Sequence, residues 1–176
     1  MKFRPLFFAV VLLLIVSPSI VQGASWISIS GMTFVGDTNI VMHKYEGISS
    51  YLTLATTIGY AWAQVNFPPN VKGKKVVRME ALVYDGLDAM FGILDVANIG
   101  VSLVKVELAT GLVIDVISTG TGYSGAPGLV TLSTTNATDA EIDNKKWAWY
   151  LRCRVELSSS NLNDELRLYG VRIRYK

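Results

Sequence analysis

The chain has 176 residues with 16 basic and 14 acidic side chains, one histidine and one cysteine. A single cysteine, Cys153, excludes an intrachain disulfide, and one cysteine with one histidine is too few for a zinc site of the usual nitrogen and sulfur ligands. Two of the basic residues, Lys2 and Arg4, lie in the N-terminal segment, so the rest of the chain is neutral. Neutrality argues against nucleic-acid binding, which needs a lasting basic excess.

The first 24 residues have the pattern of a secretory signal peptide. A short positive region precedes the apolar stretch Leu6–Val16, and small residues surround an expected cut at Gly23 or Ala24. The stretch is shorter than the about 20 residues of a membrane-spanning helix, and a retained N-terminal anchor is the alternative. We expect a signal peptide over residues 1–24 and one domain over residues 25–176 that is secreted or lies at the cell surface, with no membrane span.

The remaining chain has strand-like alternation almost throughout, with turns rich in glycine, asparagine, aspartate and proline. The expected strands are Trp26–Ser30, Asn39–Tyr45, Ser50–Thr56, Ala61–Phe67, Lys74–Tyr84, Val101–Leu108, Leu112–Ile117, Leu129–Thr134, Trp147–Leu157 and Leu166–Tyr175. Residues 88–98 form a short apolar run that periodicity alone does not assign. This order predicts a single antiparallel β-sandwich of jelly-roll type, with a barrel as the less favoured alternative.

The strand Trp147–Leu157 divides by parity into two different faces. Its odd positions, from Trp147 to Leu157, are all apolar, and its even positions carry every charge. Burying unpaired arginines is costly, whereas burying two tryptophans is favourable. We therefore expect the odd face, with Cys153, in the core, and Tyr150, Arg152 and Arg154 outside.

The last strand, Leu166–Tyr175, contains two apolar sets that are out of phase with each other. A β-bulge at or near Gly170 would turn both sets inward. If this strand paired with Trp147–Leu157, four arginines would share one outer face: Arg152, Arg154, Arg172 and Arg174. The alternatives are a solvated charged face, with acidic side chains between the arginines, and a patch that binds anions or acidic glycans.

Several other side chains are candidates for binding. Exposed aromatic residues that would stack on sugar rings are Trp62, Tyr84, Tyr123 and Tyr150. Calcium ligands would come from Asp85, Asp88 and Asp143, although no known calcium-loop pattern supports them, and we expect no other cofactor. Asn136 begins the sequence Asn-Ala-Thr, an acceptor for N-glycosylation in an exported chain.

No catalytic set is apparent in the sequence. His43 lies in an apolar strand without a nucleophile motif near it. The carboxylates Asp85, Asp88 and Asp95 would suit glycoside hydrolysis, but aspartate and glycine are also ordinary turn residues. We therefore expect that the protein is not an enzyme.

Three segments of the chain resemble a group of short exported prokaryotic proteins of unassigned function. They are "AQVNFPPNVKGKKVVRMEALVYDG", "VSLVKVELATG" and "AEIDNKKWAWYLRCRVELSSSNLNDELRLYGVRIRYK", of which the last, ending in an "LRLYGVRI.Y"-type strand, is the most specific. The resemblance covers about the last two thirds of the chain. It implies a compact exported β-sandwich and supplies no catalytic residue.

These observations lead to one main functional hypothesis and two alternatives. The first is a non-enzymatic structural or adhesion module outside the cell, with a glycan or a cell-surface polymer as its partner. The second is a carbohydrate-binding module. The third is a subunit of a filament in which the N-terminal strand, within residues 24–34, completes the sheet of a neighbouring copy.

Overall fold

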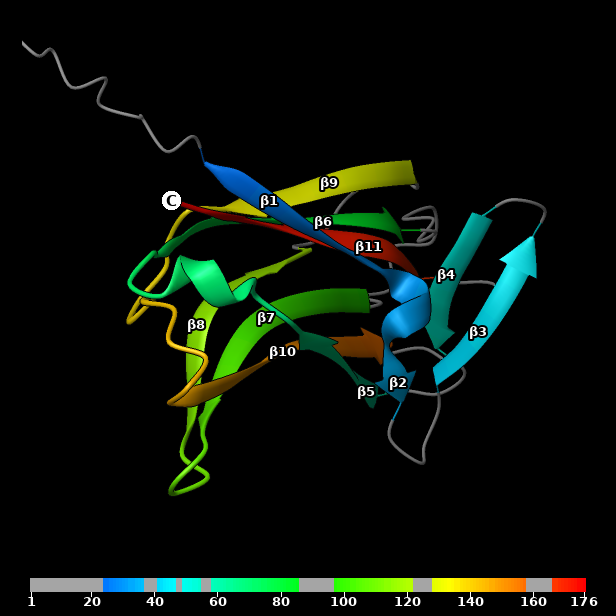
Figure 1. Cartoon of the computed structure of the whole chain (residues 1–176). Coiled ribbons are helices and arrows are strands. Elements are labelled where there is room, and N and C mark those ends of the chain that lie inside the picture. Colours follow the sequence, from blue (N-terminus) through cyan, green and yellow to red (C-terminus); the bar gives the residue numbers. More distant parts are fainter. Residues whose placement is uncertain are drawn as a thin grey trace, which may run out of the picture.

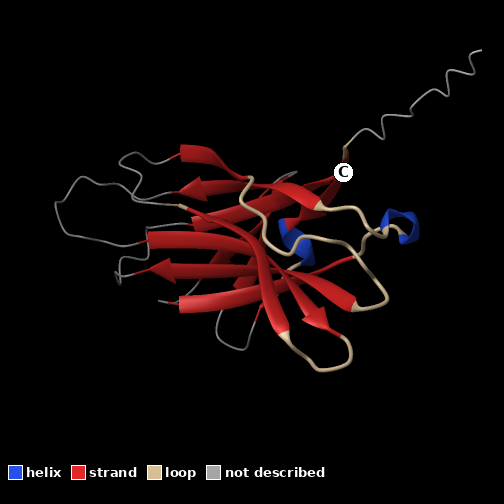
Figure 2. Ribbon diagram, turned by 90° about the vertical axis from the view of Figure 1, so that its left-hand side faces the viewer, coloured by secondary structure: helices blue, strands red, loops and turns tan. Residues whose placement is uncertain are grey.

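The computed structural model describes residues 24–36, 41–46, 49–54, 58–85, 97–121, 128–157 and 166–176. They form two antiparallel sheets packed face to face (Figure 1). Figure 2 shows the two layers from the side, with the described loops gathered at one end of the sandwich. The predicted antiparallel β-sandwich is confirmed. Among the described residues, no helix is long and apolar enough to span a membrane.

Eleven described strands and two short 3-10 helices make up this fold. The helices are η1 (Gly31–Thr33) and η2 (Pro69–Val71). The strands are β1 (Ser25–Ser30), β2 (Val35–Gly36), β3 (Val41–Glu46), β4 (Ser49–Leu54), β5 (Ile58–Val65), β6 (Val76–Asp85), β7 (Ala97–Glu107), β8 (Val113–Gly120), β9 (Gly128–Thr134), β10 (Trp147–Leu157) and β11 (Leu166–Tyr175). Sheet A has the order β3-β4-β11-β6-β9, with β1 also paired to β11, and sheet B has the order β2-β5-β10-β7-β8.

The first strand completes sheet A of its own chain. β1 pairs antiparallel with β11, from Ser25 opposite Tyr175 to Ser30 opposite Gly170. This is the ordinary arrangement of a first strand, so the described contacts give no support to strand exchange between copies, which remains a prediction. The 3-10 helix η1 then leads the chain from sheet A to β2 in sheet B.

The core lies between the sheets, and β10 contributes the residues that parity predicts. Trp149, Leu151, Cys153 and Val155 are buried, and Trp147 is buried as well. Phe67 packs edge-on against the ring of Trp149, with 5.2 Å between ring centroids. The two tryptophans of this strand therefore stabilise the core and are not available as a sugar-binding platform.

The predicted bulge in β11 is present. The register between β11 and β6 shifts between Leu168 and Gly170, so that Leu168 and Val171 both face the core. A side chain at Gly170 would put its Cβ 2.9 Å from the carbonyl oxygen of Ile29 in β1. Glycine at this position thus allows both the bulge and the close approach of β1.

The condition for a shared arginine face, that the last two strands pair, is not met. β10 and β11 do not pair, because β10 lies in the middle of sheet B and β11 lies in sheet A. Arg152 and Arg154 are therefore on the outer face of one sheet, and Arg172 and Arg174 on the outer face of the other. The four side chains do not form a common anion-binding patch.

Candidate functional site

The outer face of sheet B carries two exposed aromatic residues on one strand. Tyr60 and Trp62 alternate with the buried residues of β5, and they are 36% and 37% exposed. Residues two apart on one face of a strand are about 6.6 Å apart, a spacing that suits stacking on adjacent sugar rings. In the neighbouring strand β10, Arg154 is opposite Tyr60 and Arg152 is opposite Trp62.

Arg152 connects this aromatic pair to an acidic side chain two strands away. Its guanidinium carbon is 5.8 Å from the centre of the Trp62 ring, a cation–π distance. One of its nitrogens lies 2.9 and 3.1 Å from the two carboxylate oxygens of Asp115 in β8. The interaction crosses β7, which lies between β10 and β8.

A bulge in β8 places Asp115 on the outer face. Leu103 of β7 is opposite Ile117, but Val104 is opposite Asp115, so Val116 is the extra residue. Val116 and Ile117 are both buried. Without this extra residue, Asp115 would share the inward parity of Ile117 and would not meet Arg152.

The charges on this face are balanced within it. Arg152 pairs with Asp115, and a guanidinium nitrogen of Arg154 lies 2.8 Å from the carboxylate of Glu156. Tyr150, in the same strand and on the same face, is half-buried. The result is a neutral surface of aromatic rings, hydrogen-bond donors and carboxylate acceptors, which we call the Trp62 face; it consists of Tyr60, Trp62, Asp115, Tyr150, Arg152, Arg154 and Glu156.

The outer face of sheet A holds the remaining predicted arginines around a different tryptophan. Trp26 of β1 is 40% exposed, and the guanidinium carbons of Arg172 and Arg174 are 5.0 and 5.9 Å from its ring centre. Arg172 also pairs with Glu80, a nearly buried carboxylate that Arg78 contacts at 2.9 Å. Beside them is an open groove of about 640 Å³.

Trp26 of sheet A is about as exposed as Trp62 of sheet B, but it lies among more guanidinium groups. Two guanidinium groups lie over Trp26, whereas one lies over Trp62 among the described residues. Tyr84, another predicted sugar-stacking residue, is half-buried in β6 with Arg167 at 5.3 Å from its ring centre. Tyr123 lies outside the described residues.

The predicted calcium ligands do not come together. Asp85 ends the ten-residue strand β6. Asp143 lies near the other end of that strand, because the adjoining Ile142 bonds to Lys74, just before β6 begins. The two residues are therefore about 30 Å apart along the strand direction, and the expectation that they share one site is wrong. The third candidate, Asp88, lies outside the described residues, as does Asp95.

Asp143 instead stabilises the turn before β10. Its carboxylate accepts a hydrogen bond from the backbone N–H of Lys145 at 3.0 Å and pairs with Lys72 at 3.4 Å. The Lys145 N–H, and after it Lys72, hold the pKa of Asp143 below its ordinary value. Among the described residues, no three or more histidine, cysteine or acidic side chains form a group suited to a metal ion.

The glycosylation candidate, Asn136, is exposed in the connection between β9 and β10. The backbone N–H of Thr138, the third residue of the acceptor sequence, donates to the carbonyl of Val116 at 2.8 Å. This bond attaches the connection to the bulge of β8. Modification of Asn136 remains a prediction.

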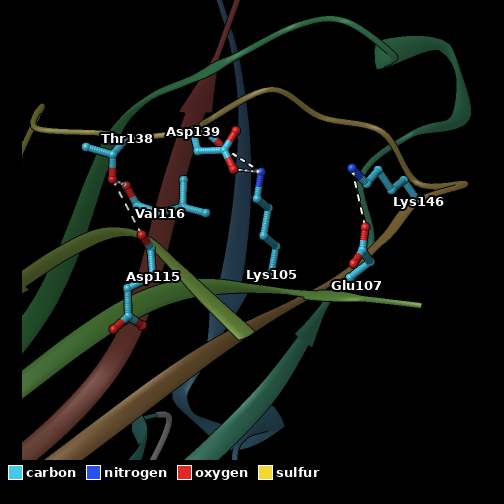
Figure 3. A network of polar contacts seen from close by, with 7 residues as sticks. All are labelled: Lys105, Glu107, Asp115, Val116, Thr138, Asp139 and Lys146. Atoms are coloured by element: carbon cyan, nitrogen blue, oxygen red, sulfur yellow. Dashed lines mark hydrogen bonds and ion pairs between the residues drawn. The ribbon is translucent and has the colours of Figure 1, made fainter. Parts of the chain in front are cut away.

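A buried lysine anchors the same connection to the core (Figure 3). Lys105 of β7 is 1% exposed, and its ammonium group is 2.7 Å from both the carboxylate and the backbone oxygen of Asp139. The ammonium group also lies 4.3 Å from the centre of the Trp147 ring. Such pairing is what makes a buried charge tolerable. Figure 3 shows this contact beside the ion pair of Lys146 with Glu107, at 3.3 Å.

Three residues described above were not singled out by the sequence pattern: Tyr60, Lys105 and Asp115. Tyr60 lies two residues before Trp62, so parity was sufficient to place both on one face. Lys105 has the same parity as the buried Leu103, so its inward position was also accessible from the pattern. The outward position of Asp115 was not accessible from the pattern, because it depends on the bulge at Val116.

Comparison with known proteins identifies the fold. No protein-family model matches the chain, and no curated protein sequence matches it. Among solved structures, the chain is similar to the C-terminal CBM6 of LamC, a marine laminarinase from Zobellia galactanivorans, with a TM-score of 0.51 and 12% identity over 85% of this chain and 98% of that one. It is also similar to a xylan-binding module, CBM15, with a TM-score of 0.50 and 15% identity over 86% and 97% of the two chains.

Proposed function

We propose that this protein is an exported, non-catalytic module that binds a neutral polysaccharide through the Trp62 face. The observation that carries the proposal is the exposed pair of Tyr60 and Trp62 beside the Arg152–Asp115 ion pair. Aromatic rings give a sugar ring an apolar surface to stack on, and flanking charged groups give its hydroxyls donors and acceptors. The sequence hypothesis of an adhesion module is compatible with this proposal, since polysaccharide binding is one way to adhere.

The charge balance of the face favours a neutral ligand over an acidic one. Arg152 and Arg154 each have a carboxylate partner, so neither is free to pair with a uronic acid or sulfate without breaking an existing ion pair. A neutral sugar can accept from the guanidinium groups and donate to the carboxylates while both pairs persist. Similarity in fold to CBM6 and CBM15 modules supports a sugar ligand without indicating which one.

Affinity electrophoresis in gels that contain soluble β-glucans or xylans tests the proposal, with calorimetry on any polymer that slows the protein. We expect Trp62→Ala to weaken binding about tenfold or more, because central aromatic residues dominate such interfaces. Trp26→Ala is a matched control: this tryptophan is about equally exposed, 40% against 37%, but lies on the other sheet.

Two results would overturn the proposal. One is an absence of binding to every neutral polysaccharide in the panel. The other is normal binding by Trp62→Ala together with a loss of binding in Trp26→Ala, which would move the ligand to the outer face of sheet A. Quenching of tryptophan fluorescence gives a second readout, because the two core tryptophans of β10 are shielded from added ligand.

A further inference from the structure

One end of the sandwich gathers most of the lysines of the chain. They come from the connection before β6, the connection before β10 and the residue after β11, and they are Lys72, Lys74, Lys75, Lys145, Lys146 and Lys176. With the buried Lys105, seven of the nine lysines lie here. Backbone bonds hold the three segments together: Lys75 and Lys176 exchange bonds of 2.9 and 3.0 Å, and Gly73 bonds to Ile142 at 2.9 Å.

The carboxylates at this end neutralise only some of these lysines. Lys72 pairs with Asp143, Lys146 with Glu107 and Lys105 with Asp139. Within the described part of the chain, the lysines that form no ion pair are Lys74, Lys75, Lys145 and Lys176, whereas Glu141 is the one acidic side chain at this end without such a pair. The end therefore carries a positive excess, although the domain as a whole is neutral.

An apolar hairpin tip lies beside Lys146, on the sheet B side of this end. The turn between β7 and β8 exposes Leu108, Leu112 and Val113, each more than half accessible to solvent. The backbone N–H of Leu108 donates to the carbonyl of Lys146 at 2.9 Å, which fixes the tip next to the lysine-bearing connection. Figure 1 shows this hairpin extending beyond the end of β10. Exposed apolar side chains that gather in one patch are typical of an interaction surface.

The chain also enters the sandwich at this end. Ser25, the first residue of β1, is opposite Tyr175 in the register, next to Lys176. Everything that precedes Ser25, including the apolar stretch of residues 6–16, is therefore attached where the lysines gather. An exported chain is held close to the membrane at that point until any signal peptide is cut.

We propose that this end of the sandwich docks on a bilayer that contains anionic lipids. The lysines without carboxylate partners would contact the phosphate groups, and the side chains of Leu108, Leu112 and Val113 would enter the boundary between headgroups and acyl chains. Basic and apolar side chains at one surface are the combination that this boundary favours. The outer faces of both sheets run away from this end, so the Trp62 face remains open to a polysaccharide, and neither proposal depends on the other.

Vesicle co-sedimentation of residues 24–176, which include every described strand, tests the proposal. We expect binding to vesicles of phosphatidylcholine with about one third phosphatidylglycerol that is about tenfold stronger than binding to phosphatidylcholine alone, and that weakens as salt is added. The double substitution Lys75→Gln and Lys145→Gln should weaken binding to the anionic vesicles about fivefold per lysine. Leu108→Ser with Leu112→Ser should also weaken it about tenfold or more.

A matched control for the tip is Leu129→Ser. Leu129 is 62% exposed, compared with 61% for Leu108, but it lies at the opposite end of the sandwich, at the start of β9 opposite Tyr84. This variant should bind vesicles as the parent does. Thermal unfolding of each variant shows that a loss of binding is not a loss of fold.

A fluorescent label distinguishes insertion from simple charge attraction. Because Cys153 is buried, Leu112→Cys introduces the one readily labelled thiol among the described residues. An environment-sensitive dye at this position should shift to shorter wavelength with anionic vesicles, and the same dye on Leu129→Cys should not. No preference for anionic vesicles, equal losses in the tip and control variants, or an unchanged spectrum at Leu112→Cys would each overturn the proposal.

Discussion

One guanidinium nitrogen of Arg152 lies 2.9 and 3.1 Å from the two carboxylate oxygens of Asp115, although these residues belong to strands that are not neighbours. The contact passes over β7, where Val104 is fully buried despite lying on the outer face of the sheet. The ion pair thus joins β10 to β8 across the intervening strand β7. It fixes the orientation of the one arginine that also lies over the Trp62 ring.

Because both partners are partly exposed, the pair should contribute little to stability. A double-mutant cycle with Arg152→Gln and Asp115→Asn, measured by urea unfolding, should give a coupling free energy of about 0.2–1 kcal/mol. Either substitution should weaken polysaccharide binding more than it weakens the fold, since Asp115→Asn frees the Arg152 side chain and Arg152→Gln removes its guanidinium group from the Trp62 ring. A coupling above about 2 kcal/mol would show instead that the pair is part of the structural core.

The parts of the fold that were predictable from sequence are those set by local alternation. β10 begins and ends where the pattern predicts, at Trp147 and Leu157, because a strand with one buried face needs strict parity. The bulge near Gly170 was predictable for the same reason, since the apolar residues change phase beside a glycine. The bounds of β10 and the bulge in β11 can therefore both be predicted from the local sequence.

The parts that were not predictable depend on long-range pairing. Nothing in the eight residues between β10 and β11 indicates that they connect different sheets, so the sequence leaves open a shared face for the four arginines that the fold does not form. The bulge at Val116 also lacks a glycine to mark it, so the sequence does not indicate that Asp115 faces outward. Of the seven residues of the Trp62 face, the sequence therefore predicts four as binding candidates, Trp62, Tyr150, Arg152 and Arg154, and does not predict Tyr60, Asp115 or Glu156.

Gly31 should be one of the least tolerant positions in the chain. A Cβ built there would lie 2.2 Å from the carbonyl oxygen of Leu168, in the backbone of β11, where nothing flexible can move aside. We expect Gly31→Ala to lower the free energy of unfolding by at least about 2 kcal/mol. Gly128→Ala is the control: nothing lies within 4 Å of a Cβ at that position, and the change should be within about 0.5 kcal/mol. Equal effects in the two variants would contradict the close packing of η1 on β11.

Cys153 should be inert in the native protein. Burial raises the pKa of its thiol to about 12 from the ordinary value of 9.0. Labelling by a thiol reagent at pH 8 should therefore proceed only as fast as the protein unfolds, and at the ordinary rate in denaturant. Rapid labelling of the folded protein would contradict the buried position.

The same shift predicts how stability depends on alkaline pH. The unfolded chain loses the Cys153 proton near pH 9, but the folded chain holds it to about pH 12. The contribution of the thiol to stability is therefore fully present below pH 9 and declines as the pH rises toward 12. Cys153→Ala should lose less stability than the parent between pH 8 and 10.5, as measured by urea unfolding. An equal decline in both proteins would mean that other groups account for it.

Lys105 and Asp139 should respond unequally to substitution. Asp139→Asn leaves the ammonium group buried against Trp147 without its carboxylate, and asparagine tolerates the positive φ of 46° at this position. Lys105→Met removes the buried charge, fills the space with an apolar chain and leaves Asp139, which is largely exposed, to water. Leaving a buried charge without its partner lowers the free energy of unfolding more than replacing that charge with an apolar side chain. We expect urea unfolding to show a loss of about 1–3 kcal/mol for Asp139→Asn and a smaller loss for Lys105→Met. The reverse order would mean that the ion pair itself, rather than the avoidance of an unpaired buried charge, stabilises the connection between β9 and β10.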